Sequence, residues 1–209
     1  MEHPADDRSM TPAGSDLMII ESAMPVFDVA IAEHVVVAAD PSSTFHAARA
    51  LDLLSVRTPL LTASMWLRGL PARLSGVTAP RPPRIVIGEG VGLPGWMALG
   101  EVADREIAFG AVGIFWRPVI EWRHVAPENF SAFAEPGWGK IAADFSVMRY
   151  GKLSTLLSYE CRTMTTDPDS RREFLRYWWL VRPFVAHIMR ATVNKIKADA
   201  EAAPENGER

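Results

Sequence analysis

The sequence predicts an α+β fold in which an antiparallel sheet wraps around one long C-terminal helix. Residues 167–202 contain no glycine and place apolar side chains at steps of three or four, the period of a helix surface. Residues 96–165 instead divide into strand-like segments separated by short turns, without intervening helices. Parallel strands need long crossover connections, so we expect an antiparallel sheet.

The region before this sheet predicts a lead-in, a strand and two helices. Residues 1–25 mix proline, glycine, serine and acids, a composition typical of disorder. Residues 26–39 alternate apolar positions and then run continuously apolar, which predicts a strand. Asp-Pro and Thr-Pro pairs supply a cap and a first-turn proline for helices over about 40–54 and 58–69.

Residues 71–94 are rich in proline and glycine and predict a loop with at most one short strand at 85–87. The strand at 106–116 is apolar on both alternating faces, so we expect protein on both sides of it. Gly110 and Gly113 interrupt that strand, and we expect them to let it curl under the final helix. The remaining predicted elements are strands at 96–102, 119–125, 138–148 and 152–165, with one helical turn or an ordered loop at 127–133.

The final helix begins with Asp167-Pro168-Asp169, a cap, a first-turn proline and an acid that favours the positive helix end. At 1.5 Å per residue it is on the order of 50 Å long, so it must lie across the sheet or project beyond it. Pro183 removes one backbone donor and predicts a bend. We therefore expect one domain over 26–202 and a disordered tail at 203–209.

The composition narrows the function classes. The 209 residues are 48% hydrophobic with a net charge of −3, which gives no overall case for nucleic-acid binding. No apolar run approaches about 20 residues, so we expect no stable membrane insertion. A single cysteine, Cys161, and an acidic start without a signal-like segment predict a cytoplasmic protein. No His, Cys or Asp spacing matches a metal site, and we expect neither a metal nor an organic cofactor.

Five segments of the sequence are distinctive: 35–41 (VVVAADP), 110–116 (GAVGIFW), 130–140 (FSAFAEPGWGK), 160–163 (ECRT) and 171–178 (RREFLRYW). They resemble the START-like superfamily, also called SRPBCC or helix-grip proteins, and within it an uncharacterised actinobacterial-type branch near polyketide cyclase/dehydrase-like proteins. The resemblance covers about residues 26–202. It implies a helix-grip fold with an internal cavity, and it does not imply one reaction.

We expect an apolar cavity between the sheet and the final helix, where a hydrophobic or amphipathic small molecule, such as a lipid or polyketide, binds. For any one residue of the expected cavity wall, the alternative is that it simply packs in the hydrophobic core. Arg162 would orient a polar ligand group, unless it forms an ion-pair network with Glu160 on the other sheet face. The expected ligand-binding residues are Phe109, Phe115, Trp116, Trp122, Trp138, Phe145, Leu157, Tyr159, Arg162, Tyr177, Trp178, Val181 and Val185.

Two other functions stay open. A cyclase or dehydratase would use the same cavity with acid/base groups, for which His124, Asp144 and Tyr159 are the candidates. A protein-binding function would use the basic final helix, whose residues 171–197 carry seven Lys or Arg against one acid. An exposed Trp179 and a small sealed interior would favour that function. The same Arg-aromatic segment could also lie on a membrane surface.

Overall fold

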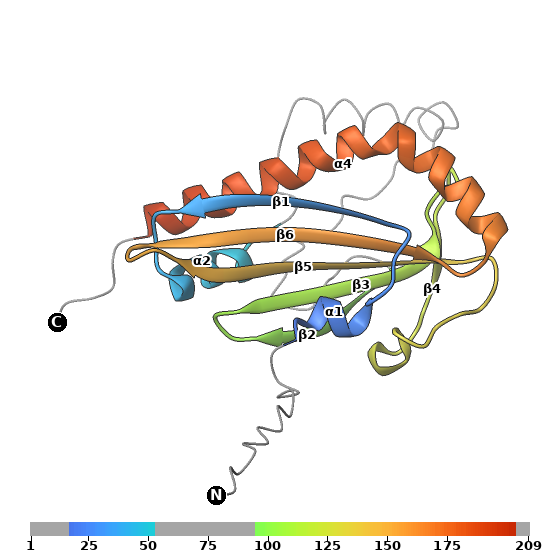
Figure 1. Cartoon of the computed structure of the whole chain (residues 1–209), viewed down its shortest axis with the longest axis horizontal. Helices are drawn as coiled ribbons and strands as arrows, with labels where there is room; N and C mark the ends of the chain where they lie inside the picture. The colour runs from blue at the N-terminus through green and yellow to red at the C-terminus, as the bar shows by residue number, and fades with distance from the viewer. Residues whose placement is uncertain (1–16, 53–94, 204–209) are drawn as a thin grey trace, which may run out of the picture.

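The computed structural model describes residues 17–52 and 95–203. There the fold is α+β, a curved antiparallel sheet under one long C-terminal helix (Figure 1), which is the predicted helix-grip arrangement. The elements in chain order are α1 (Ile19–Ala23), β1 (Val29–Val37), α2 (Pro41–Arg49), β2 (Trp96–Val102), β3 (Glu106–Ile114), β4 (Glu121–Arg123), the 3₁₀ turn η3 (Pro127–Asn129), β5 (Gly139–Tyr150), β6 (Ser154–Thr165) and α4 (Pro168–Ala202).

The six described strands form one sheet in the order β1-β6-β5-β3-β2, and β4 pairs with β3 beyond the end of β2. The pairing aligns Phe109, Ala143 and Cys161 across β3, β5 and β6. Because side chains alternate between the two faces of a strand, this register fixes which residues face α4. We call the face toward α4 the inner face and the opposite one the outer face.

Each face of the sheet carries an apolar core. On the inner face, Phe109, Phe145 and Leu157 pack with Val193 and Ile196 of α4. On the outer face a second cluster joins α1 and the η3 region to β3 and β5, through Ile20, Met24, Val112, Phe130 and Ala142. Every residue of β3 is therefore buried, as its two-sided apolar pattern predicted.

The glycines of β3 make room for aromatic rings. A Cβ at Gly110 would lie 3.0 Å from Phe130 Cε2 and 3.0 Å from the Ile141 carbonyl oxygen. A Cβ at Gly113 would lie 3.0 Å from Phe115 Cε1. Real Cβ atoms rarely approach neighbours this closely. Glycine is needed at position 110 because the Phe130 ring approaches the strand closely on the outer face. This reason differs from the predicted one, that glycine lets the strand curl under the helix.

Polar contacts hold the N-terminal end of α4 to the edge of the sheet. The Asp167 carboxylate accepts hydrogen bonds from the Ser170 hydroxyl at 2.6 Å, the Ser170 amide at 2.9 Å and the Gly137 amide at 2.6 Å. These bonds lower the pKa of Asp167 to about 2, because they stabilise its charged form. Trp116 Nε1 donates to the Glu173 carboxylate at 2.8 Å. The predicted cap is thus confirmed, and it also joins the helix to the loop before β5.

The C-terminal half of α4 is attached to β1. Lys197 Nζ donates to the Val36 carbonyl at 2.7 Å, and the Ala38 amide donates to the Glu201 carboxylate at 2.8 Å. Arg190 pairs with Glu33 at 2.9 Å. Between these attached ends the helix arches over the sheet, with Pro183 inside it (Figure 1).

Some boundaries differ from the predictions. Residues 17–25 are not a disordered lead-in, because α1 forms there and buries Ile20 and Met24 against the outer face. Helix α2 ends at Arg49, and Leu51 then turns into the inner core. The strand expected at 119–125 is limited to β4. The helix expected at 58–69, the strand at 85–87 and the tail from 204 lie outside the described residues.

Candidate functional site

The inner surface of α4 is buried at both ends and only half-buried between them. Phe174 is buried near the N-terminus, and Met189, Val193 and Ile196 are buried toward the C-terminus. The side chains between them follow at steps of four, three, four and three and share the stripe of Phe174, because a helix repeats its faces at these steps. They are Trp178, Val181, Val185 and Ile188, and all four are half-buried.

The sheet has a matching half-buried set on its inner face. Neighbouring inner residues such as Phe109, Phe145 and Leu157 are almost fully buried. Trp96, Tyr159 and Cys161 pack against this core but keep exposed surface. We call these three residues, together with Trp178, Val181, Val185 and Ile188 of α4, the inner belt.

Tyr159 and Cys161 are the polar members of the inner belt. The Tyr159 ring lies 4.3 Å from the Phe145 ring, and its hydroxyl has no hydrogen-bond partner among the residues that the structure describes. Burial raises the pKa of Tyr159, and burial with the nearby carboxylates raises the pKa of Cys161 to about 12. Both side chains are therefore neutral near neutral pH and can act as hydrogen-bonding groups.

The structure divides the predicted ligand-binding residues between several environments. Tyr159, Trp178, Val181 and Val185 belong to the inner belt, and Tyr177 is half-buried beside them on α4. Phe115 and Trp122 pack on each other at a ring distance of 5.9 Å, over Gly113. Trp116 packs on Phe174 at 6.1 Å. Phe109, Phe145 and Leu157 lie in the closed part of the inner core.

Arg162 and Trp138 lie on the outer face, away from α4. Arg162 Nε donates to the Glu160 carboxylate at 2.6 Å, and its guanidinium lies 5.0 Å from the centre of the Phe27 ring. It also donates to the Met24 carbonyl at 3.1 Å. Trp138 packs with the outer core. Arg162 therefore forms an ion pair with Glu160, the alternative to orienting a ligand.

A cluster of carboxylates lies beneath α1 on the outer face. The buried Glu106 accepts hydrogen bonds from the amides of Ile19 at 2.6 Å and Ile20 at 3.0 Å, which fixes the N-terminus of α1. Asp144, also buried, has one carboxylate oxygen without a partner among the described residues. Burial, followed by the charges of Glu106 and Glu160, raises the pKa of Asp144 to about 7. Signals for this cluster are absent from the local sequence, because its members are brought together by strand register.

The three catalytic candidates do not form one group. His124 is exposed after β4, Asp144 lies on the outer face, and Tyr159 lies on the inner face. Proton transfer needs donor and acceptor within hydrogen-bond reach of the same substrate atom, which opposite faces of a sheet do not provide. Within residues 17–52 and 95–203, no three His, Cys, Asp or Glu side chains are arranged to hold a metal ion.

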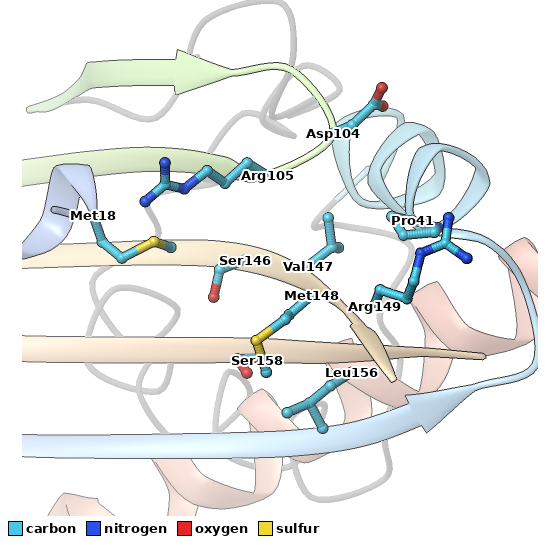
Figure 2. A pocket seen from close by; sticks show the side chains of 10 residues that line it. All are labelled: Met18, Pro41, Asp104, Arg105, Ser146, Val147, Met148, Arg149, Leu156 and Ser158. Carbon is cyan, nitrogen blue, oxygen red and sulfur yellow. The ribbon is translucent and has the colours of Figure 1, made fainter. Parts of the chain in front are cut away.

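A separate groove of about 520 Å³ lies at the end of the sheet near the β5–β6 hairpin (Figure 2). Its walls mix the apolar side chains of Met18, Met148 and Leu156 with the basic groups of Arg105 and Arg149. The sequence interpretation did not single out this groove. The other lining residues are Pro41, Asp104, Ser146, Val147 and Ser158.

Comparisons with known proteins give distant likenesses only. No protein-family model matches the chain, and no curated protein sequence does. Among solved structures, TTHA0849 from Thermus thermophilus is 11% identical with a TM-score of 0.30, over 85% of this chain and 100% of that one. CalU16 from Micromonospora echinospora is 11% identical with a TM-score of 0.28, over 82% and 83%. The Zhui aromatase/cyclase from Streptomyces sp. R1128 is 10% identical with a TM-score of 0.28, over 84% and 98%.

At these TM-scores the likenesses say nothing about function.

None of the helices in the described residues combines the length and the apolar character that crossing a bilayer requires.

Proposed function

We propose that the chain is a START-like protein that binds a hydrophobic or amphipathic small molecule against the inner belt. The observation that carries the proposal is the stripe of α4, which is buried at both ends and half-buried at Trp178, Val181, Val185 and Ile188. Interiors are normally packed to near-crystal density, so an inward-facing apolar stretch that keeps exposed surface favours a space for another molecule.

The opposite wall supports the same interpretation. Tyr159 and Cys161 keep exposed surface, yet burial is the main cause of their raised pKa values. This combination is typical of groups that border an enclosed space, where bulk water is excluded but contact atoms are missing. The Tyr159 hydroxyl, which bonds to none of the described residues, supplies one group that can orient a hydroxyl or carbonyl of the ligand.

The binding energy would come mainly from apolar burial. A ligand that removes roughly 300 Å² of apolar surface from water gains about 7 kcal/mol before the costs of association. A flat or elongated molecule with one polar end suits a wall of Trp, Val and Ile side chains with a single Tyr hydroxyl. A lipid or a polyketide has this character.

Catalysis by a cyclase or dehydratase mechanism is the less favoured alternative. The inner belt offers Tyr159 and Cys161, and their raised pKa values keep both protonated near neutral pH. The deprotonated form of either side chain is then too scarce to act efficiently as a base. Asp144, whose pKa of about 7 would suit acid/base work, lies on the opposite face of the sheet.

Native mass spectrometry of the purified chain, with extraction of co-purified lipophilic compounds, tests the proposal. We expect a bound compound, and a hydrophobic library should raise the melting temperature of the emptied protein. Val185→Trp should fill the space and remove both signals while the protein stays folded. Val119→Trp is the matched control, because Val119 is 79% exposed outside the inner belt. Repeated absence of any ligand and any thermal shift would contradict the proposal.

The observation that favours the protein-binding alternative is the exposure of Trp179, which is 82% exposed on α4. A binding surface on the outside of α4 does not require an empty interior, so the two functions can be tested separately.

A further inference from the structure

The side of α4 that points away from the sheet changes character along its length. Toward the C-terminus, Asn194 and Ala198 lie four residues apart on this side, and both are exposed. One is polar and the other is small, as on an ordinary solvated helix face, whereas Arg190 and Glu201 at its margin contact Glu33 and Ala38. Toward the N-terminus the same row continues through the half-buried His187 to Pro183, Trp179 and Arg176.

That N-terminal part of the row is apolar and exposed. Trp179 is 82% exposed, Leu180 is 62% exposed and Phe184 is 40% exposed. The sheet does not need these side chains, because the inner stripe of the same helix segment already faces it. We define the outer patch as Arg176, Trp179, Leu180 and Pro183, together with Arg182 and Phe184, which lie at its two opposite edges because residues two apart on a helix do not face the same way. Clustered exposed apolar residues of this size mark an interaction surface, whereas single ones do not.

The charged residues of the outer patch are both arginines. The segment 168–184 contains two acids, of which Asp169 pairs with Arg172 and Glu173 accepts from Trp116. Arg176 and Arg182 have no ion-pair partner among the residues that the structure describes. A surface that matches the outer patch must therefore be negatively charged and must accept protruding apolar side chains.

The shape of the outer patch distinguishes between possible occupants. α4 is the outermost element on its side of the described fold and arches away from the sheet, so the outer patch lies on a convex surface (Figure 1). A protein partner would need a groove to receive Trp179 and Leu180. A lipid surface needs no preformed groove, because head groups separate around Trp, Leu and Phe side chains while arginines contact the phosphates.

We propose that the outer patch docks this protein onto anionic membrane surfaces, with Trp179 and Leu180 entering the head-group region. The docking is shallow. Pro183 has no amide hydrogen, so the Trp179 carbonyl lacks its helical partner and needs a polar neighbour, which water or a lipid head group supplies. The inference does not depend on the ligand proposal, since the outer patch and the inner belt lie on opposite sides of α4.

Sedimentation of the full-length chain with vesicles tests the docking. We expect binding to phosphatidylcholine vesicles that contain phosphatidylserine, and much weaker binding to pure phosphatidylcholine. Removing each arginine should weaken binding about fivefold at low salt, since a basic residue near such a surface contributes about 1 kcal/mol. Trp179→Ala should weaken binding about tenfold. Leu153→Ala and Arg149→Gln are the matched controls, because both positions are exposed at the β5–β6 hairpin.

The other occupants give different results, and each would overturn the inference. Binding to soluble polyglutamate but not to vesicles would identify the outer patch as a site for an acidic protein. A dimer in solution that Trp179→Ala dissociates would identify it as a contact between copies of the chain. Vesicle binding that is unchanged by Trp179→Ala and by the Arg176→Gln, Arg182→Gln double variant would place membrane contact elsewhere. None of these results affects the ligand test with Val185→Trp.

Discussion

Replacing Asp144 by Asn should remove a loss of stability that the wild-type protein undergoes as pH rises. Asp144 is 2% exposed, and one of its carboxylate oxygens has no partner among the described residues. Its pKa rises to about 7, first because it is buried and then because Glu106 and Glu160 are nearby. Hydrogen bonds from Ser146 and from the Glu160 backbone only partly counteract these effects.

The sign follows from the two pKa values. In the unfolded chain Asp144 ionises near 3.8, and in the folded protein its pKa is about 7. The folded state therefore holds a proton that the unfolded state has lost between these values, and stability falls as pH rises through this range. The difference of about three pH units, at 1.36 kcal/mol each, corresponds to about 4 kcal/mol. Part of the raised pKa comes from the charges of Glu106 and Glu160, so about 4 kcal/mol is an upper limit for the burial of Asp144 alone.

Urea unfolding of wild type and Asp144→Asn, at pH values from about 5 to 8, measures the effect. We expect the variant to gain stability relative to the wild type as pH rises, because an amide cannot ionise. Asp104→Asn is the matched control, since Asp104 is exposed in the β2–β3 turn. A difference in unfolding free energy that stays constant with pH, or a variant that is less stable at the alkaline end, would refute the reasoning.

Three further substitutions test the contacts that define the fold. Gly110→Val should cost about 1–3 kcal/mol, because the new side chain meets Phe130, and an unchanged melting temperature would contradict this packing. Asp167→Ala should cost about 1 kcal/mol of unfolding free energy by removing the α4 cap. Because the cap lowers the pKa of Asp167 from 3.8 to about 2, this cost should disappear as the pH of the unfolding measurement falls from 3.8 toward 2. A cost that stays the same at low pH would contradict the assigned cap. Glu106→Gln should speed hydrogen exchange at residues 19–20, whose amides it holds, whereas equal protection would show that other contacts fix α1.

The sequence was sufficient to predict the elements whose signals are local. The cap at Asp167 and the unbroken stripe that follows it predict α4 to within a residue at its start. The two-sided apolar pattern of β3 predicts that it is covered on both faces. In these cases the deciding interactions lie within a few residues of one another, so periodicity and capping chemistry are enough.

Features that depend on distant contacts were not predictable in this way. Helix α1 has five residues, too few to be stable alone, and its N-terminus is held by Glu106, which is 87 residues away from Ile19. Alternation put Glu160 and Arg162 on one face but could not decide which face is inner. That choice depends on the register between β5 and β6, in which Ala143 and Phe145 align with Cys161 and Tyr159.

The middle of α4 carries apolar side chains on both sides, and this is the property that connects the two proposals. A helix on a protein surface normally needs one apolar stripe, and additional exposed apolar area favours association. Here the stripe toward the sheet is half-buried at Val181 and Val185, while the opposite side exposes Trp179 and Leu180. Polar contacts hold the helix at its ends, so this segment need not be packed tightly for the fold to form. We infer that its side chains are suited to two external contacts, and that single substitutions on one side should leave the other contact intact.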